Sequence, residues 1–216
     1  MIRTIRYTIL LLIVSQCSIL SGQDRKYYDE FYSALNTIIR SKYKEISQIT
    51  NVTLPVYRTP YGNESVNKDS AEVPPPPPPG VIYYNHNSFC YLTYNEQLDS
   101  MDVKFMYESI DSTKTFLIDP NRVQLRIIPA ETVYEILRKS EGDFQEADDI
   151  IEKKFGSRNF IRVSTPIYNS NYSRIIITVT SHAGPKSSLG ETFVMKKQNN
   201  VWKTVKSTII VTRKKK

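Results

Sequence analysis

The chain has 216 residues, of which 40% are hydrophobic and 24% charged, which is enough apolar side chain for a folded core and excludes a wholly disordered protein. Two cysteines are too few for a disulfide-rich scaffold, and the two histidines lie 96 positions apart, which does not match the ligand spacing of a structural Cys and His zinc site. The formal net charge of +7 is unevenly distributed, because residues 24–155 carry 15 basic and 21 acidic side chains, whereas residues 156–216 carry 12 basic side chains and one acidic side chain.

Residues 1–23 have the pattern of a secretory signal peptide. Two arginines precede the apolar run 9–14, and small and polar residues follow as far as Gln23. The run is shorter than the roughly 18 residues that a membrane-spanning helix requires. Cys17 lies just after the run, where bacterial lipoproteins are lipidated, so two alternatives remain open: cleavage near Gln23 or lipidation of Cys17. Both predict an exported protein that is periplasmic, anchored in the outer membrane or secreted.

The residues after the signal peptide divide into a helix and a spacer. Apolar side chains recur at helical spacing over residues 24–46, which predicts an amphipathic helix. The sequence leaves open whether this helix packs on the following domain or extends from it. Residues 47–80 lose the pattern and include six consecutive prolines, 74–79, which form a semi-rigid rod of about 19 Å at roughly 3.1 Å per residue. We therefore predict a Pro-rich flexible segment over residues 47–80.

An α+β domain is predicted over residues 81–212, followed by a basic tail, 213–216. Its first short aromatic runs, 81–84 and 89–94, suggest a hairpin whose turn contains His86. A helix capped by Ser100 follows, and then come two short strands at 116–118 and 123–128, which flank an Asp-Pro-Asn turn. A second short helix is indicated by Val133, Ile136 and Leu137.

A third helix has clear boundaries in the sequence. Asp143 and Glu146 form a capping-box-like pair at its start, and Gly156 provides a stop. Asp148, Asp149 and Glu152 are expected to form part of its solvated face.

The last sixty residues predict an antiparallel β-meander of about four strands with one buried face. Apolar side chains alternate over 161–167 and 175–179, and the Gln198-Asn199-Asn200 turn leads into a strand that begins near Trp202. On that strand Val205, Ile209 and Val211 are expected to share a face. Helices followed by a meander define the α+β class.

Several stretches carry a family resemblance: the helix 102–110, the Ser-Thr-Pro-Ile-Tyr-Asn strand end at 164–169, the strand 173–180, the loop from Gly184 to Gly190, and the Lys-Gln-Asn-Asn-Val-Trp-Lys hairpin at 197–203. Over roughly residues 95–210, the chain resembles a family of secreted or lipid-anchored proteins of unknown function from Bacteroidetes-type bacteria. The resemblance implies export and no particular activity. The chain departs from the pattern at Tyr168, where Phe is usual, and lacks the Cys often found in the glycine-containing loop. The meander also resembles the cone-shaped folds of the nuclear-transport-factor and ketosteroid-isomerase class, in topology only.

His182 is the leading candidate for a ligand-binding residue, together with Ser181, Gly184 and Gly190. It lies at a strand end beside a loop with two glycines, and loops held by a rigid sheet often carry function. A histidine can act as a general base near neutral pH. Neighbouring strand residues point to opposite faces, however, so Ser181 and His182 are not expected to form a nucleophile pair. No catalytic residue, metal site or cofactor is predicted. Cys90 is expected to be a small buried hydrophobe without a histidine partner.

The sequence predicts a non-enzymatic, exported cell-envelope domain that binds an unidentified envelope protein or glycan. Nucleic acid is not an expected partner, because the basic third lacks interleaved aromatic residues, and a membrane is expected only through a lipid anchor. The alternative is a small-molecule-binding protein or acid/base enzyme with a cone-shaped pocket between helices and sheet, which would use Asp, Tyr or His182. A third interpretation is adhesion through the basic C-terminal surface, which moderate salt should abolish.

Overall fold

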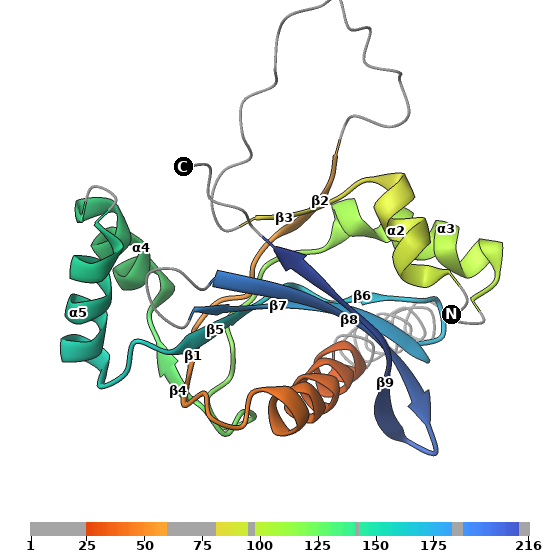
Figure 1. Cartoon of the computed structure of the whole chain (residues 1–216). Coiled ribbons are helices and arrows are strands. Elements are labelled where there is room, and N and C mark those ends of the chain that lie inside the picture. Colours follow the sequence, from red (N-terminus) through yellow and green to blue (C-terminus); the bar gives the residue numbers. More distant parts are fainter. Residues whose placement is uncertain (1–24, 60–80, 95–97, 141–142, 183–187, 212–216) are drawn as a thin grey trace, which may run out of the picture.

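The computed structural model describes residues 25–59, 81–94, 98–140, 143–182 and 188–211, and it has the predicted α+β class (Figure 1). The predicted signal peptide, the proline run and the basic tail lie outside these residues. A mixed β-sheet forms the centre, with helices on both of its faces and at one end. Its strands lie side by side in the order β4 (Arg126–Ile128), β1 (Gln48–Thr50), β5 (Phe160–Val163), β7 (Arg174–His182), β8 (Ser188–Gln198) and β9 (Val201–Val211).

The C-terminal part of the sheet confirms the predicted antiparallel meander. Strands β5, β7, β8 and β9 are neighbours and run antiparallel, and the short β6 (Ile167–Tyr168) also pairs with β7. The β8–β9 turn contains Asn199 and Asn200 with φ angles of 49° and 61°. Positive φ at both central residues is what a two-residue type I′ hairpin requires, and asparagine tolerates that conformation.

The other half of the sheet is parallel and was not predicted. Strand β1 pairs in parallel with both β4 and β5, while β2 (Val56–Arg58) pairs in parallel with β3 (Ile82–Tyr84) in a separate two-stranded sheet. The expectation of a flexible segment over residues 47–80 is therefore wrong for residues 48–50 and 56–58. All three residues of β1 are buried, so its sequence, Gln-Ile-Thr, has no alternation of buried and exposed positions that could reveal a strand.

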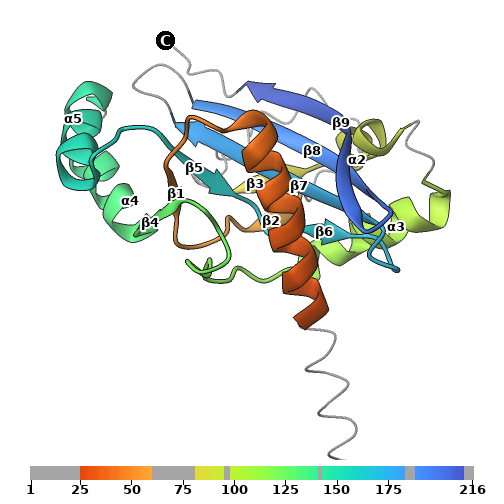
Figure 2. The ribbon, with the colours of Figure 1, turned by 90° about the horizontal axis from the view of Figure 1, so that it is seen from below.

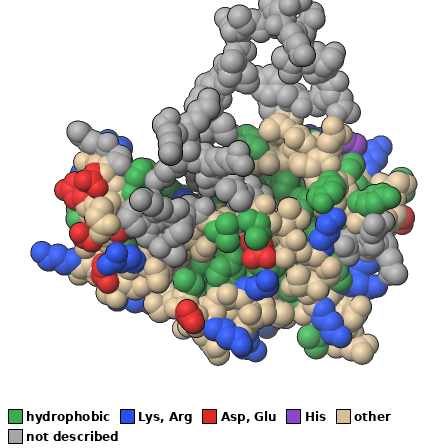
Figure 3. Space-filling view, in the orientation of Figure 1, with side chains coloured by type: hydrophobic (Ala, Val, Ile, Leu, Met, Phe, Trp, Pro, Cys, Tyr) green, Lys and Arg blue, Asp and Glu red, His purple; other side chains and the backbone are tan. Residues whose placement is uncertain are grey.

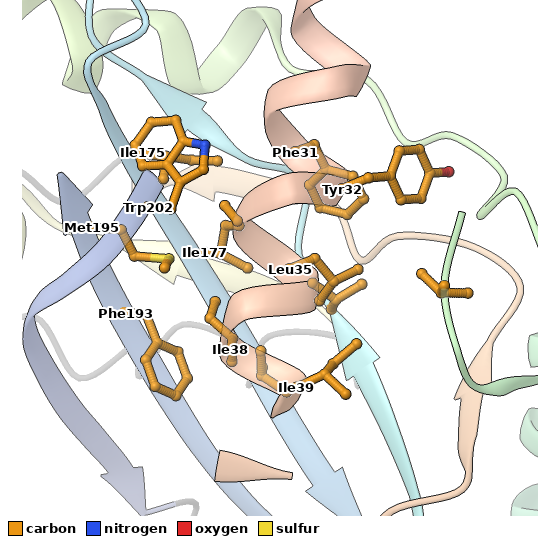
Figure 4. Close-up of a cluster of buried hydrophobic side chains, with 14 of the residues drawn as sticks. Phe31, Tyr32, Leu35, Ile38, Ile39, Ile175, Ile177, Phe193, Met195 and Trp202 are labelled. Carbon is orange, nitrogen blue, oxygen red and sulfur yellow. The ribbon is translucent and has the colours of Figure 1, made fainter. Parts of the chain in front are cut away.

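The N-terminal helix, described from residue 25 to residue 42, lies across one face of the sheet (Figure 2). It ends four residues before the predicted end at residue 46. Its apolar face packs against the meander, which shows that the helix packs on the domain (Figure 4). The core that they form includes Phe31, Leu35 and Ile38 from the helix and Ile175, Ile177, Phe193, Met195 and Trp202 from the sheet.

The opposite face of the sheet is covered by α2 (His86–Thr93), α3 (Ser100–Ser109) and the β2–β3 pair (Figure 1). A single turn, η1 (Ile110–Ser112), continues α3. The expected hairpin around His86 is wrong, because the Asn85 side chain accepts a hydrogen bond from the Ser88 amide and starts α2 instead. Helix α3 begins where expected, but Asp99 caps it rather than Ser100.

Helices α4 (Ala130–Lys139) and α5 (Phe144–Phe155) pack at the β4–β1–β5 end of the sheet (Figure 1). The predicted start of α5 is confirmed, since the Asp143 side chain accepts hydrogen bonds from the amides of Gln145 and Glu146. Gly156 ends it with a φ of 82°, a left-handed conformation that favours glycine. No helix among the described residues is long and apolar enough to span a membrane.

Two strand predictions need correction. Of the segments 116–118 and 123–128, only residues 126–128 form a strand in the sheet, and Leu117 makes an isolated bridge to Val52. On β9, Val205 and Ile209 are 38% and 56% exposed rather than on a buried face. Strand β9 is the edge of the sheet, and its register against β8 shifts between Val194 and Met195, near Val205. The described elements therefore leave Val205 and Ile209 of β9 largely uncovered.

Candidate functional site

His182, the leading candidate from the sequence, is the last residue of β7, and its side chain contacts α5. Its Nε2 atom lies 2.6 Å from Oδ1 of Asp148, and its ring stacks on Phe160 with 4.9 Å between ring centroids. The Asp148 side chain is completely buried, which corrects the expectation of a solvated position. The other carboxylate oxygen of Asp148 has no hydrogen-bond partner among the described residues. His182 is therefore a structural partner of a buried carboxylate.

The remaining candidates do not assemble a site with His182 in the described part of the chain. Ser181 donates a hydrogen bond to the backbone carbonyl of Leu189 on β8, at 3.3 Å. Gly190 is buried within β8 and is paired with Thr180. Gly184 and Cys17 lie outside the described residues.

A groove with a volume of about 1020 Å³ lies between α2 and α3. Its apolar lining comes from Tyr94, Leu98, Val103 and Tyr107. Val103 and Tyr107 lie four residues apart on α3, so both face the same side of that helix. Both are partly buried and pack against the core on this face of the sheet, and the Tyr107 ring lies 5.3 Å from the His86 ring of α2 between centroids.

His86 and Cys90 lie on the α2 side of this groove. They are one helical turn apart, and the Cys90 sulfur lies 3.7 Å from each of the two imidazole nitrogens. This corrects the expectation that Cys90 has no local histidine. A thiol that donates its proton to an imidazole points at one of the two nitrogens. The equal distances show that the Cys90 sulfur does not point at either one. The four-residue spacing was visible in the sequence, but it has meaning only on a helix, and a hairpin was expected here.

A charged pair, Arg58 and Asp111, borders the groove. The Arg58 Nε atom donates a hydrogen bond to Asp111 Oδ2 at 2.7 Å, and its guanidinium lies 5.5 Å from the centroid of the Tyr107 ring. The hydrogen bond from Arg58 lowers the pKa of Asp111 below its ordinary value, so the pair stays charged at neutral pH. Both side chains are more than a third exposed, so the pair contributes little to the stability of the fold. Its main effect is to hold the Arg58 side chain at the edge of the groove.

Comparison of the chain with protein-family models, with curated proteins and with solved structures found no match. The described residues contain no group of three or more His, Cys, Asp and Glu side chains that could hold a metal ion. The candidate site therefore rests on its own geometry: an open, mainly apolar groove with charged side chains at its rim.

Proposed function

We propose that this protein is an exported cell-envelope protein whose folded part binds a ligand with an apolar body in the α2–α3 groove, without catalysing a reaction. The observation that carries the proposal is the groove of about 1020 Å³, at the upper end of the sizes usual for small-molecule sites. The signal-peptide pattern of residues 1–23 supports export.

The surface around the groove supports binding as well. Four large apolar side chains of α2 and α3 and of the residue after α2 are between 47% and 72% exposed: Tyr91, Tyr94, Met101 and Phe105. Hydrophobic side chains gather over this region in the space-filling view (Figure 3). Large apolar side chains that gather on a surface, rather than being scattered singly, are typical of binding sites.

The alternative, a cone-shaped pocket between helix and sheet, is less well supported. The space between the N-terminal helix and the meander is occupied by packed side chains, including Leu35, Ile177 and Phe193, each 0% exposed (Figure 4). An acid/base site at that place would need ionisable groups that face a cavity.

Blocking the groove tests the proposed site. Ser100 lines the groove and is exposed, so replacing it with tryptophan places an indole ring there without disturbing a buried position. We expect the S100W variant to bind the fluorescent apolar probe N-phenyl-1-naphthylamine about tenfold more weakly than the parent chain, a difference of about 1.4 kcal/mol. Fluorescence titration measures the dissociation constants.

The matched control is E135W on α4, an exposed helical position outside the groove. It should bind the probe with the affinity of the parent chain. Probe binding that S100W and E135W leave equally unchanged would contradict the groove as the binding site, as would a parent chain that binds no probe.

Export is tested by the mass and location of the chain produced with its own N-terminus in a Bacteroidetes-type host. A mass that begins at Cys17 with added acyl chains, in the membrane fraction, would identify a lipoprotein. A mass that begins near Gln23, in the soluble periplasmic or secreted fraction, would identify simple cleavage. An unprocessed chain that starts at residue 1 and stays in the cytoplasm would contradict export.

A further inference from the structure

A second, polar hollow lies on another part of the molecule and shares no lining residue with the α2–α3 groove. It has a volume of about 330 Å³. Three segments that are distant in sequence meet there: the beginning of the described N-terminal helix, the turn between β6 and β7, and the turn between β8 and β9. The lining consists mainly of side chains that can donate or accept hydrogen bonds: Lys26, Glu30, Asn171, Ser173, Asn199 and Asn200.

The backbone around this polar hollow is held in fixed, uncommon conformations. Among the described residues other than glycine, positive φ angles occur at Tyr172, Asn199 and Asn200, and all three line the hollow. Asparagine adopts this conformation readily, but a bulky tyrosine at a φ of 60° is unusual. Neighbouring bonds hold Tyr172, because its amide donates to the Asn169 carbonyl and the Asn169 side chain accepts from the Ser173 amide. Such conformations concentrate at functional sites.

The charges in the hollow do not cancel. Glu30 is buried and accepts hydrogen bonds from the indole nitrogen of Trp202, at 3.0 Å, and from the ammonium group of Lys197. These two donors hold the carboxylate in place, and Lys197 neutralises it. The ammonium group of Lys26 lies 4.9 Å from the centroid of the Tyr172 ring, and no ion pair joins Lys26 to a described carboxylate. One positive charge therefore remains for a ligand.

The mixture of donors and acceptors indicates the class of ligand. Asparagine side chains both donate and accept, ammonium groups only donate, and a carboxylate only accepts. A sulfate ion or a phosphodiester presents acceptors alone, so it has no proton to donate to the Glu30 carboxylate. A sugar has hydroxyl groups that both donate and accept, and it suits this set of partners. The remaining positive charge of Lys26 favours a sugar that carries a carboxylate.

We propose that the polar hollow is a second binding site, and that it takes an acidic sugar unit of a polysaccharide, such as a uronic acid. Its volume of about 330 Å³ is at the lower end for small-ligand sites, which fits one sugar unit rather than a long stretch of chain. The turns carry the asparagine amides, Glu30 accepts from sugar hydroxyl groups, and Lys26 pairs with the sugar carboxylate.

Titration of the isotopically labelled full chain with tri-galacturonic acid, followed by amide NMR, tests this site. We expect the side-chain amide signals of Asn171, Asn199 and Asn200 to shift, and the neutral trisaccharide maltotriose to bind more weakly. N200G removes one amide but keeps the turn, because glycine is favoured at the second position of a type I′ hairpin. It should weaken binding of the acidic trisaccharide about fivefold, or roughly 1 kcal/mol.

The role of charge is tested by K26Q and by its matched control, K203Q. Both remove one exposed lysine charge, but Lys203 lies on β9 outside the hollow. Weaker binding by K26Q, with K203Q like the parent chain, would support the proposal. Equal losses in the two variants would show non-specific attraction to the basic surface and overturn it. So would equal binding of maltotriose and tri-galacturonic acid, or the absence of shifts at the three asparagines.

Discussion

Replacing His182 with alanine is expected to lower the free energy of unfolding by about 3–5 kcal/mol, because it leaves a buried carboxylate without its partner. The Asp148 side chain is 0% exposed, and its bond to His182 is 2.6 Å long. Its second oxygen already has no hydrogen-bond partner among the described residues, so without His182 neither oxygen of this buried carboxylate has one of the described partners. Urea denaturation measures the effect, with the fluorescence of Trp202, the single tryptophan of the chain, as the signal.

The double variant H182A/D148N distinguishes the cause of that loss. If the unpaired charge is responsible, removing it should restore part of the stability that H182A loses. D149A, on the exposed side of the same helix, should change stability by less than about 0.5 kcal/mol. An H182A variant as stable as the parent chain would contradict the structural role assigned to this pair, and a double variant less stable than H182A would contradict the charge explanation.

Truncation of Trp202 should have a comparably large effect. The indole is 1% exposed and packs between the N-terminal helix and the meander, so W202A creates a large cavity and should cost about 3–5 kcal/mol. W202F keeps most of the packing but removes the donor to Glu30, so its cost should be smaller, about 1–3 kcal/mol. Circular dichroism during urea denaturation measures both variants, because each lacks the tryptophan signal.

The neighbouring position supplies the control for these variants. Val201 is 55% exposed at the start of the same strand, and V201A should change the free energy of unfolding by less than about 0.5 kcal/mol. A W202A variant no less stable than V201A would show that the helix–meander contact is not a main source of stability. Equal losses for W202F and W202A would instead assign the effect to the Glu30 hydrogen bond rather than to packing.

The elements that the sequence predicted well are those specified by nearby residues. Helix α5 has its cap at Asp143 and its stop at Gly156, both adjacent to its ends, and the meander shows its alternation within single strands. Strand β1 was missed because its three residues form a strand only through pairing with β4 and β5, which lie far along the chain. Helix α2 was mistaken for a hairpin because its aromatic residues favour strands, whereas the Asn85 cap and the burial of Phe89 decide for a helix.

The candidate site was harder to predict, because it depends on contacts between distant segments. The α2–α3 groove also includes Arg58 from β2, and no local pattern brings that residue near Val103. Asp148 stands among charged residues and has the local pattern of a solvated position. It is buried because His182, 34 positions later, supplies its partner. Asn199 and Asn200 were predicted as turn residues, and they form the β8–β9 turn, but their proximity to Lys26 and Glu30 depends on the fold.

The position of β9 at the edge of the sheet bears on the role of the basic side chains of that strand. This strand has eleven residues, and in the described part of the chain its outer side pairs with nothing. It also exposes Val205 and Ile209, so it has the features of a template for aggregation. Lys203 is exposed on this strand, and like charges that lie opposite one another destabilise the pairing of two strands. We therefore expect the basic side chains of this strand to oppose edge-to-edge association of two copies.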